Sequence, residues 1–406
     1  MDYKKIFIFL LTIYVSVSLY AQNIIEWRND RTGIYSNEKG LLKSWPPEGP
    51  KLLWHVDGLG EGHSSVSIAS DKLYTTGMIG GKGFLFVISR EGKLLNKVMY
   101  GDEWNESYVG TRATPVVNDG KIYLMSGKGD LVCLDEKSLN TVWSKKIFVE
   151  FKSKNIRWGF CESPLIIDEK LIITPGGKEY NVVALNKNTG KLIWSSPGVG
   201  DLSAYCSPLY INDQEIPLIV TKTADHIIGL EATTGKLLWS MENKNRNAIH
   251  ANTPVYANNM ILTASVDKGA TMLRLSNGGR KVEKVWEVPG LDNMMGALMK
   301  TGNYIYGSSS GDRTPKLFFC VDWMTGEIKY KEASIGVGVT IFADGLLYFY
   351  SDRGIMALIK PTPDKFDLIS KFPITLGTDT HWAHPVIYQG VLYLRHGDCL
   401  MAYKVN

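Results

Sequence analysis

One phrase recurs along most of this chain, and it limits the possible folds more than any other feature. It reads "TPVVNDGKIYLMSGKGDLVCLDEKSLNTVWS" from Thr114, "SPLIIDEKLIITPGGKEYNVVALNKNTGKLIWS" from Ser163 and "SPLYINDQEIPLIVTKTADHIIGLEATTGKLLWS" from Ser207. A further copy begins at Thr253, and weaker copies flank these four. A period of about 40–50 residues indicates a fold built from similar units, each packed on its neighbours.

The number of units follows from two series of equivalent apolar residues. In the second apolar run of each unit, one such residue recurs at intervals of 42 to 49 residues. This series is Tyr74, Tyr123, Ile172, Ile219, Leu262, Tyr306, Tyr348 and Tyr393. The series from the third run is Ile88, Leu134, Leu185, Leu230, Leu275, Val321, Leu358 and Tyr403. Both series indicate eight units.

Within each unit the pattern is that of antiparallel β-structure. Short runs rich in Val, Ile, Leu and Tyr are separated by turn signals such as Asp119-Gly120 and Thr189-Gly190. No segment keeps the apolar period of 3.6 residues that indicates a long helix. Four short strands per unit at this period are typical of a propeller. We therefore predict an all-β fold, an eight-bladed β-propeller of four-stranded antiparallel blades, over residues 50–406.

The two ends of the repeat region complement each other. The last unit, "HPVIYQGVLYLRHGDCLMAYKVN", supplies three strands before the chain ends at Asn406. The phrase "KLLW" at 51–54 matches the fourth strand of the unit that ends at Trp239, yet no unit precedes it. We therefore predict that a strand at about 51–56 pairs in the last blade and closes the ring, which removes an exposed sheet edge.

Large and sulfur-containing residues that recur with the repeat are predicted to be structural. A tryptophan begins the outer strand of successive units, at Trp143, Trp194, Trp239 and Trp286, and is expected to pack between blades. Cys133 and Cys320 occupy the same strand position in two units and are expected to be core thiols. The chain has 5 cysteines and no C-x-x-C pair, so neither a disulfide framework nor a cysteine metal site is predicted.

The N-terminus has the features of an export signal. Lys4 and Lys5 precede an apolar run that ends at Tyr20, and Ala21 is a small residue suited to cleavage. We therefore predict a signal peptide over 1–21, a lead segment over 22–49 and a periplasmic or extracellular protein. Whether the lead forms a strand, a brace or a loose end stays open. The formal charge of +4, without a run of like charges, gives no support for a nucleic acid or membrane partner, and we expect a monomer.

The units from Thr114 and Ser163 resemble the repeat of the pyrroloquinoline-quinone-like (PQQ-like) β-propellers. That repeat runs Ser-Pro, strand, Asp-Gly, strand, Gly-x-Gly, Ala-Leu-Asp, Thr-Gly-Lys and Trp, and the likeness extends from about residue 50 to the C-terminus. The lead "EWRNDRTGIYSNEKGLLKSWPPEGP" is similar to the opening of secreted bacterial members. The resemblance implies either a quinone-dependent alcohol (polyvinyl-alcohol-like) dehydrogenase or a non-enzymatic role, as in the propeller lipoprotein of the outer-membrane barrel assembly machinery.

Ligand sites of propellers lie at one mouth of the central channel, on the loops that lead into the innermost strands. In this chain those loops directly precede each Ser/Thr-Pro or its equivalent, and they carry histidine, aromatic and charged residues. The candidate ligand-binding residues are His63, Arg112, Trp158, Glu162, Tyr205, His250, Asn252, His381 and Trp382. Arg112 is expected to grip an anionic group and the aromatic residues to stack on a flat ring or sugar face. The expected ligand is a small molecule, a saccharide or another envelope protein.

Enzymatic alternatives remain. By the resemblance, a dehydrogenase requires PQQ and a Ca²⁺ ion with hard oxygen ligands, and Glu162, Asn252 and Asp292 are the candidate set. A propeller hydrolase or lyase acting on saccharides would use Glu162 with Asp201 or Asp292. The chain lacks the vicinal cysteine pair of the best-known dehydrogenases and a C-x-x-C-H haem motif. We therefore predict a binding module without a quinone cofactor and without an assigned catalytic residue.

Overall fold

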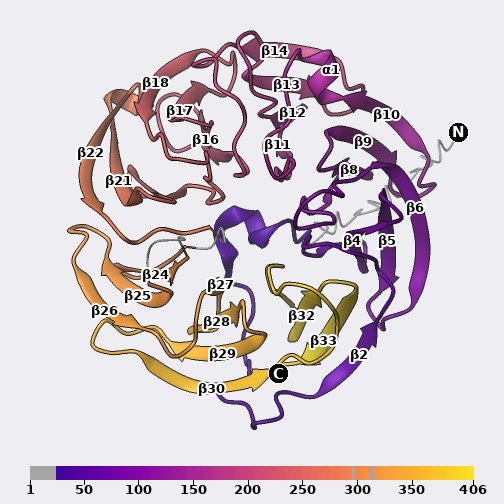
Figure 1. The fold of residues 1–406 in the computed structure, drawn as a ribbon, viewed down its shortest axis with the longest axis vertical. Coiled ribbons are helices and arrows are strands. Elements are labelled where there is room, and N and C mark those ends of the chain that lie inside the picture. The colour runs from indigo at the N-terminus through magenta and orange to yellow at the C-terminus, as the bar shows by residue number, and fades with distance from the viewer. Residues whose placement is uncertain (1–23, 295–297, 311–314) are drawn as a thin grey trace, which may run out of the picture.

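The computed structural model describes residues 24–294, 298–310 and 315–406 and shows a closed ring of blades around a central channel (Figure 1). Each blade is a sheet of four antiparallel strands, and one of them carries an additional parallel strand at its inner edge. The described part of the chain contains eight such blades. The predicted fold class and the predicted number of blades are therefore confirmed. The expected signal peptide lies outside the described residues.

The blades follow one another in chain order. Blade one comprises β3 (Ser67–Ala69), β4 (Lys72–Ile79), β5 (Lys82–Ser89) and β6 (Leu94–Asp102), and blade two comprises β7 (Val116–Asn118), β8 (Lys121–Met125), β9 (Asp130–Asp135) and β10 (Thr141–Lys146). Blade three comprises β11 (Leu165–Ile167), β12 (Lys170–Ile173), β13 (Val182–Asn186) and β14 (Leu192–Ser196), and blade four comprises β15 (Leu209–Ile211), β16 (Leu218–Lys222), β17 (His226–Glu231) and β18 (Leu237–Glu242). Blade five comprises β19 (Val255–Ala257), β20 (Met260–Ser265), β21 (Gly269–Ser276) and β22 (Lys281–Val288), and blade six comprises β23 (Met299–Thr301), β24 (Tyr304–Ser309), β25 (Leu317–Asp322) and β26 (Ile328–Glu332). Blade seven comprises β27 (Gly338–Ala343), β28 (Leu346–Ser351), β29 (Ile355–Lys360) and β30 (Asp367–Pro373), and blade eight comprises β31 (Val386–Tyr388), β32 (Val391–His396), β33 (Cys399–Lys404) and β2 (Leu52–Val56). The short helices are α1 (Ile147–Glu150), η1 (Asn29–Gly33) and η2 (Asn277–Gly279).

The ring closes as the sequence predicts. Strand β2 pairs antiparallel with β33, so the chain segment before the first blade supplies the outer strand of the eighth. The indole of Trp54 then reaches the first blade, where its Nε1–H donates to the Arg90 carbonyl oxygen at 2.8 Å. Arg395 on β32 also crosses this junction, donating to Thr75 Oγ1 at 2.6 Å and to the Thr76 carbonyl oxygen. The N-terminal strand therefore joins the last blade to the first.

The apolar side chains of the repeat form the core between blades. The residues of both eightfold series are buried. Trp143 and Trp286 donate their Nε1–H to the carbonyl oxygens of Lys187 and Trp323 in the next blade, at 3.0 and 3.1 Å. The ring of Trp194 lies against Gly235 of the next blade, without a hydrogen bond from its Nε1–H to the described residues. The predicted packing of these tryptophans between blades is therefore confirmed. Cys133 and Cys320 are buried free thiols, also as predicted.

The serine or threonine that opens the repeats of blades one to four links neighbouring blades near the channel. The amide of Ser65 donates to Thr114 Oγ1, the amide of Thr114 to Ser163 Oγ, and the amide of Ser163 to Ser207 Oγ, each at 3.0 Å. A hydroxyl at this position therefore satisfies a backbone donor of the preceding blade, which explains why the repeat requires Ser or Thr there.

The alternation of strand direction gives the ring two distinct faces. The segments that lead into the innermost strands, and the turns between second and third strands, lie on one face, which we call the loop face. The turns between first and second strands lie on the opposite face, which we call the hairpin face. Both assignments follow from the antiparallel strand order in every blade.

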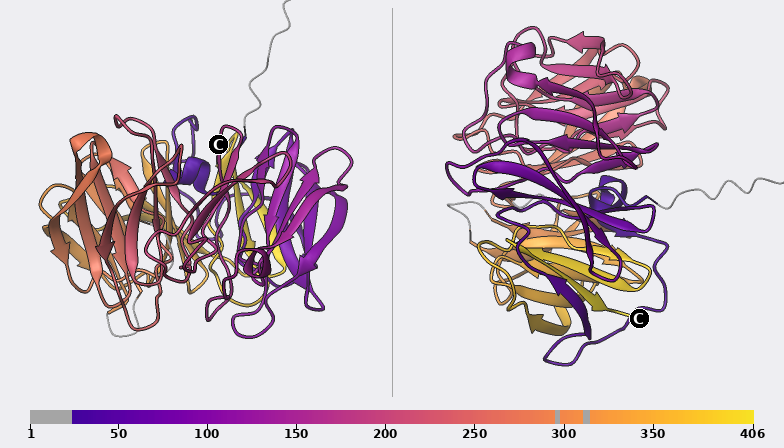
Figure 2. Two further views of the ribbon diagram at one scale, coloured as in Figure 1. Left: turned by 90° about the horizontal axis from the view of Figure 1, so that it is seen from above. Right: turned by 90° about the vertical axis from the view of Figure 1, so that its right-hand side faces the viewer.

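The lead segment is neither loose nor outside the ring. Residues 24–35, drawn in indigo, occupy the centre of the ring in Figure 1 and lie between the blades in the side view of Figure 2. Ile25 pairs antiparallel with Ile68 of the innermost strand β3, and β1 (Ile34–Tyr35) pairs in parallel with the innermost strand β27. The segment therefore runs towards the loop face, turns at Trp27 to Arg31, and returns to the hairpin face. We call residues 24–35 the channel segment.

The chain between the channel segment and β2 crosses the hairpin face. Glu38 accepts hydrogen bonds from the amides of Gln389 and Gly390, and Lys43 forms an ion pair of 2.7 Å with Asp344. Trp45 is buried against Tyr348 and Phe372 of the seventh blade. The lead thus includes a strand and a brace, which resolves what the sequence left open. None of the helices in the described ranges is long and apolar enough to cross a membrane.

Candidate functional site

A cavity of about 370 Å³ opens at the mouth of the channel on the loop face. Its walls are strongly aromatic: Trp27, Tyr108, Trp158, Tyr205 and Trp382 all line it. The rings contact one another around the opening. Tyr108 and Trp382 lie with ring centroids 5.2 Å apart, and Trp158 and Tyr205 6.0 Å apart. Apolar walls with few polar groups are typical of sites that enclose a ligand ring.

The repeat itself determines which side chains reach this cavity. In six blades a side chain at the same loop position lines the cavity. This position lies two residues before the Ser/Thr that links neighbouring blades, or two residues before His384 in the eighth blade. The residues at this position are His63, Arg112, Cys161, Tyr205, Ala251 and Trp382. Side chains of an extended segment point alternately to opposite sides, so the residues one and three positions before the linkage point away from the cavity.

This alternation divides the nine residues predicted from the sequence. Five of them line the cavity: His63, Arg112, Trp158, Tyr205 and Trp382. The other four, Glu162, His250, Asn252 and His381, stand one or three positions before the linkage and are not part of its lining. The cavity thus lies at the loop-face mouth, and only the loop residues whose side chains point into it form its lining.

The imidazole of His63 combines an aromatic contact with an unsatisfied polar atom. Its ring centroid lies 5.0 Å from that of Trp382, and its Nδ1 is 3.3 Å from Thr380 Oγ1. Its Nε2 is buried and has no hydrogen-bond partner among the described residues. The Tyr108 backbone lies near the ring and acts to raise the pKa of His63. Burial and the charges of Arg112 and Arg395 lower the pKa of His63 to about 3, so the ring is neutral near pH 7.

Arg112 does not present the anion grip expected from the sequence. Its guanidinium donates to the carbonyl oxygens of Gly110 at 2.6 Å, Tyr108 at 2.6 Å and Ser107 at 3.1 Å. These bonds fold the loop that places Tyr108 at the cavity wall. Arg112 therefore shapes the wall, because three of the five N–H donors of its guanidinium bind the backbone.

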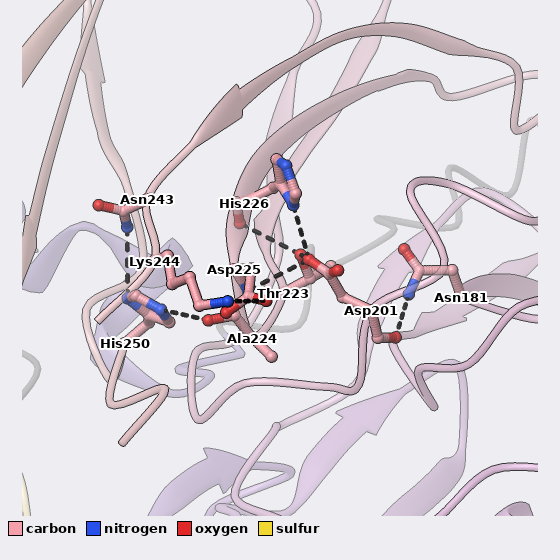
Figure 3. A network of polar contacts seen from close by, with 9 residues as sticks. All are labelled: Asn181, Asp201, Thr223, Ala224, Asp225, His226, Asn243, Lys244 and His250. Atoms are coloured by element: carbon pink, nitrogen blue, oxygen red, sulfur yellow. Dashed lines mark hydrogen bonds and ion pairs between the residues drawn. The ribbon is translucent and has the colours of Figure 1, made fainter. Parts of the chain in front are cut away.

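His250 and Asp201 belong to a polar network behind the mouth (Figure 3). His250 is within hydrogen-bond distance of the Ala224 carbonyl oxygen through Nε2, at 2.9 Å, and of Ser265 Oγ through Nδ1, at 2.8 Å. Asp201 accepts a hydrogen bond from Thr223 Oγ1 at 2.6 Å and lies 2.8 Å from His226 Nδ1. Both side chains therefore order the loops of blades four and five.

The other two predicted residues also have local partners. His381 lies 2.6 Å from the Tyr350 hydroxyl and stacks on His396 at 3.6 Å. Asn252 donates through Nδ2 to the Asn293 carbonyl oxygen at 2.8 Å. Met295 and Gly296 of the adjoining loop, which the sequence also placed at the mouth, lie outside the described residues.

Glu162, Asn252 and Asp292 do not form a calcium site in this arrangement. Glu162 and Asn252 occupy equivalent positions in blades three and five, with Cys206 at that position in the blade between. The carboxylate of Asp292 accepts the amides of Asp267 and Gly269 at 3.0 Å, so it caps its own hairpin. Across the described ranges, no three His, Cys, Asp or Glu side chains group as a metal site would require.

The surroundings of Glu162 also disfavour a cation. Its Oε2 accepts the Thr174 amide at 3.0 Å, whereas its Oε1 is buried without a partner among the described residues. Burial raises the pKa of Glu162 to about 8, so the carboxyl is largely protonated near pH 7. The positive charge of Arg31, from the channel segment, acts on the same carboxyl. The residues present therefore do not fit the quinone-bound Ca²⁺ that the resemblance implies.

The hydrolase alternative meets a similar obstacle. No carboxylate belongs to the described lining of the cavity. Burial raises the pKa of Asp201, but the hydrogen bonds from Thr223 and His226 outweigh it and hold the pKa below its usual range. Glu162 and Asp201 are thus both engaged away from the cavity, and the arrangement offers no acid and base pair to a sugar bound there.

Two aromatic lining residues were not among the residues predicted from the sequence. Trp27 lies in the lead, far from any repeat, so no repeat position marks it. Tyr108 lies in the long loop between blades one and two, where no repeat position marks it either. Asn247, Ile249, Met294, His384 and the hydroxyl residues Ser163 and Ser207 complete the lining.

With this geometry established, comparison with known proteins identifies the family. Residues 38–332 match the family model described as outer membrane protein assembly factor BamB. The chain belongs to this family. It is thus a member of the PQQ-like β-propellers, as the repeat resemblance implied. A search of curated protein sequences finds no significant match.

Solved structures with the same fold include proteins of different function. BamB from Moraxella catarrhalis is 14% identical with a TM-score of 0.63, over 87% of this chain and 99% of that one. The quinohemoprotein alcohol dehydrogenase from Comamonas testosteroni is 12% identical with a TM-score of 0.63, over 94% of this chain and 79% of that one. A europium-containing methanol dehydrogenase is 12% identical with a TM-score of 0.63, over 92% and 90% of the two chains. At these identities the likeness establishes the fold alone.

Proposed function

We propose that this protein is a non-catalytic binding module of the cell envelope, which captures an apolar group of its ligand in the loop-face cavity. The observation that carries the proposal is the cavity itself, in which five aromatic side chains from separate loops surround about 370 Å³. Burying apolar surface in such a site is the main source of affinity.

The proposed function does not use a quinone cofactor. Arg31 supplies a positive charge beside Glu162, and Glu162, Asn252 and Asp292 each form a hydrogen bond with the backbone. The five cysteines in the described structure are free, so no disulfide covers a flat cofactor. Binding of a ligand, rather than oxidation of an alcohol, is therefore the activity that these side chains support.

The proposed location is outside the cytoplasm. The basic and apolar first 21 residues have the pattern of a secretory signal, and the matching family is named for an outer membrane assembly factor. An envelope protein partner that inserts an apolar side chain, or a free small molecule, would both be compatible with this location.

The neutral fluorescent probe N-phenyl-1-naphthylamine tests the proposal. Its emission should rise on titration with the mature protein. The apparent affinity of the probe should be at least tenfold lower for the double variant Trp158→Ala/Trp382→Ala. Trp143→Phe, which changes a tryptophan between blades, is the matched control and should bind as the unchanged protein does. In parallel, PQQ with CaCl₂ should give neither a shift in melting temperature nor dye-linked alcohol oxidation. Probe binding that ignores the cavity double variant, or quinone-dependent turnover, would refute the proposal.

A further inference from the structure

The floor of the cavity is not made by the propeller blades. Trp27, from the channel segment, lines the cavity from within the channel, and its ring centroid lies 5.5 Å from that of His384. The segment occupies the channel beneath it, paired with β3 on one side and with β27 on the other. The channel segment therefore supplies the floor of the cavity on the loop face.

The backbone that presents Trp27 is held in a strained conformation. Arg28, Asn29, Asp30 and Arg31 are four successive non-glycine residues with positive φ, between 42° and 62°. This left-handed region costs an L-residue about 1–2 kcal/mol, somewhat less for Asn and Asp. Strain of this kind persists only where surrounding contacts determine it, and it concentrates at functional sites.

Two buried arginines supply those contacts. Arg28 donates to the Thr340 carbonyl oxygen at 3.3 Å and lies 3.0 Å from His384 Nδ1. Arg31 donates to the Ser163 and Pro164 carbonyl oxygens at 3.2 and 2.7 Å. The turn is thus tied to blades three, seven and eight at once, which fixes Trp27 relative to the walls.

The charge around the cavity favours an uncharged occupant. Within the described lining there is no carboxylate to pair with a cation, and the one guanidinium, of Arg112, is engaged by three carbonyl oxygens. His63 stays neutral near pH 7 because burial lowers its pKa to about 3. The guanidinium of Arg28 can only donate, so Nδ1 of His384 is the acceptor of their contact.

We infer that the site takes a compact, uncharged ring that enters from the loop face, rests on Trp27 and hydrogen-bonds to Nε2 of His63. An extended chain threaded through the channel is excluded by the channel segment. A saccharide finds few polar partners among the described walls, where Asn247 is the only carboxamide. This inference rests on the proposed function and specifies the chemistry of its ligand.

A series of naphthalene probes of equal size tests the charge and the hydrogen bond. 1-Naphthalenemethanol should bind the mature protein at least tenfold more tightly than 1-naphthoate or 1-naphthylmethylammonium at pH 7, by calorimetry or ligand-observed NMR. It should also bind several-fold more tightly than 1-methylnaphthalene, which lacks the hydroxyl. His63→Phe should abolish this last difference, because it removes the ring nitrogen that accepts from the hydroxyl.

The role of the channel segment is tested by its tryptophan. Trp27→Ala should weaken 1-naphthalenemethanol at least tenfold, whereas Trp45→Phe, in the brace on the hairpin face, should not change its affinity. If Trp27→Ala fails to fold, Trp27→Leu keeps an apolar side chain there and should still weaken the alcohol several-fold.

The outcomes separate this inference from the proposed function. The inference is overturned if either charged probe binds more tightly than 1-naphthalenemethanol, or if Trp27→Ala leaves the affinity for 1-naphthalenemethanol unchanged. Neither result would affect the proposed function, which depends on the response of N-phenyl-1-naphthylamine to the cavity double variant. Failure of every naphthalene probe and of N-phenyl-1-naphthylamine to bind overturns both.

Discussion

Replacing Trp54 with alanine tests whether the N-terminal strand closes the ring. The indole joins two blades that are far apart in sequence: it sits on β2 of the eighth blade and covers Gly92 of the first, where an added Cβ would lie 2.6 Å from the ring. Its Nε1–H donates to the Arg90 carbonyl oxygen at 2.8 Å. Leu52 and Leu53, its neighbours on β2, are exposed, so Trp54 provides the principal side-chain contact of this strand with the first blade.

The expected loss can be worked from these contacts. A tryptophan buries about 150–250 Å² when enclosed. Trp54 is only partly buried, and alanine would keep part of that area, so about 100 Å² of apolar burial is lost. At about 25 cal/mol per Å² this is about 2.5 kcal/mol, and the lost hydrogen bond adds about 1 kcal/mol. We therefore expect Trp54→Ala to lower the free energy of unfolding by about 3.5 kcal/mol.

Equilibrium urea unfolding of the mature protein, followed by circular dichroism, measures this loss. Trp143→Ala removes the same type of contact between blades two and three and should cost a similar amount. Leu53→Ala, on the exposed side of β2, should cost less than about 0.5 kcal/mol. If Trp54→Ala is no more destabilising than Leu53→Ala, β2 does not hold the ring closed and the reasoning is refuted.

Three further predictions concern charge and coupling. Burial raises the pKa of Glu162 from 4.5 to about 8, so folding favours its protonated form. This contribution is present below about pH 4.5 and is lost as the pH rises to about 8. Glu162→Gln should therefore gain stability relative to the unchanged protein across this range, by about 5 kcal/mol at its upper end, in urea unfolding at each pH. A gain that does not grow with pH would contradict this. Arg395→Met removes the buried guanidinium's hydrogen bonds to Thr75 Oγ1 and to the Thr76 carbonyl oxygen and should cost about 3 kcal/mol in the same assay. A loss below about 1 kcal/mol would show that these charged hydrogen bonds contribute little. Bound 1-naphthalenemethanol should slow hydrogen exchange of the amides of Leu52–Val56 as well as those around Trp27, and protection confined to the loop face would show that the two closures are independent.

The sequence determined the ring more completely than the site. The eightfold series of buried residues and the stray "KLLW" were sufficient for blade number and closure, because each reflects packing that the repeat imposes at every copy. The mouth loops were also identified correctly, since the connection into each innermost strand must lie on one face. The repeat period does not indicate whether the side chain of a loop residue points into the cavity or away from it.

Side-chain alternation was the signal that could have refined the site. Glu162 and Asn252 stand one position before the linkage residue and point between blades, whereas Cys161 and Tyr205, two positions before, line the cavity. Counting in steps of two from the Ser/Thr-Pro would have separated them. Trp27 was beyond such counting, because its position depends on a segment that docks through tertiary contacts and not through any repeat.

The N-terminal lead closes this propeller twice, and the two closures are continuous in the chain. Strand β2 closes the ring at its rim, the channel segment closes the channel at its centre, and the brace anchored by Glu38, Lys43 and Trp45 connects them across the hairpin face. The left-handed turn at Arg28–Arg31 is strained by itself, so its conformation depends on all of these anchors together. We therefore expect the shape of the cavity floor to be coupled to ring closure, which the hydrogen-exchange experiment tests, so that one stretch of sequence would both stabilise the fold and limit what the cavity accepts.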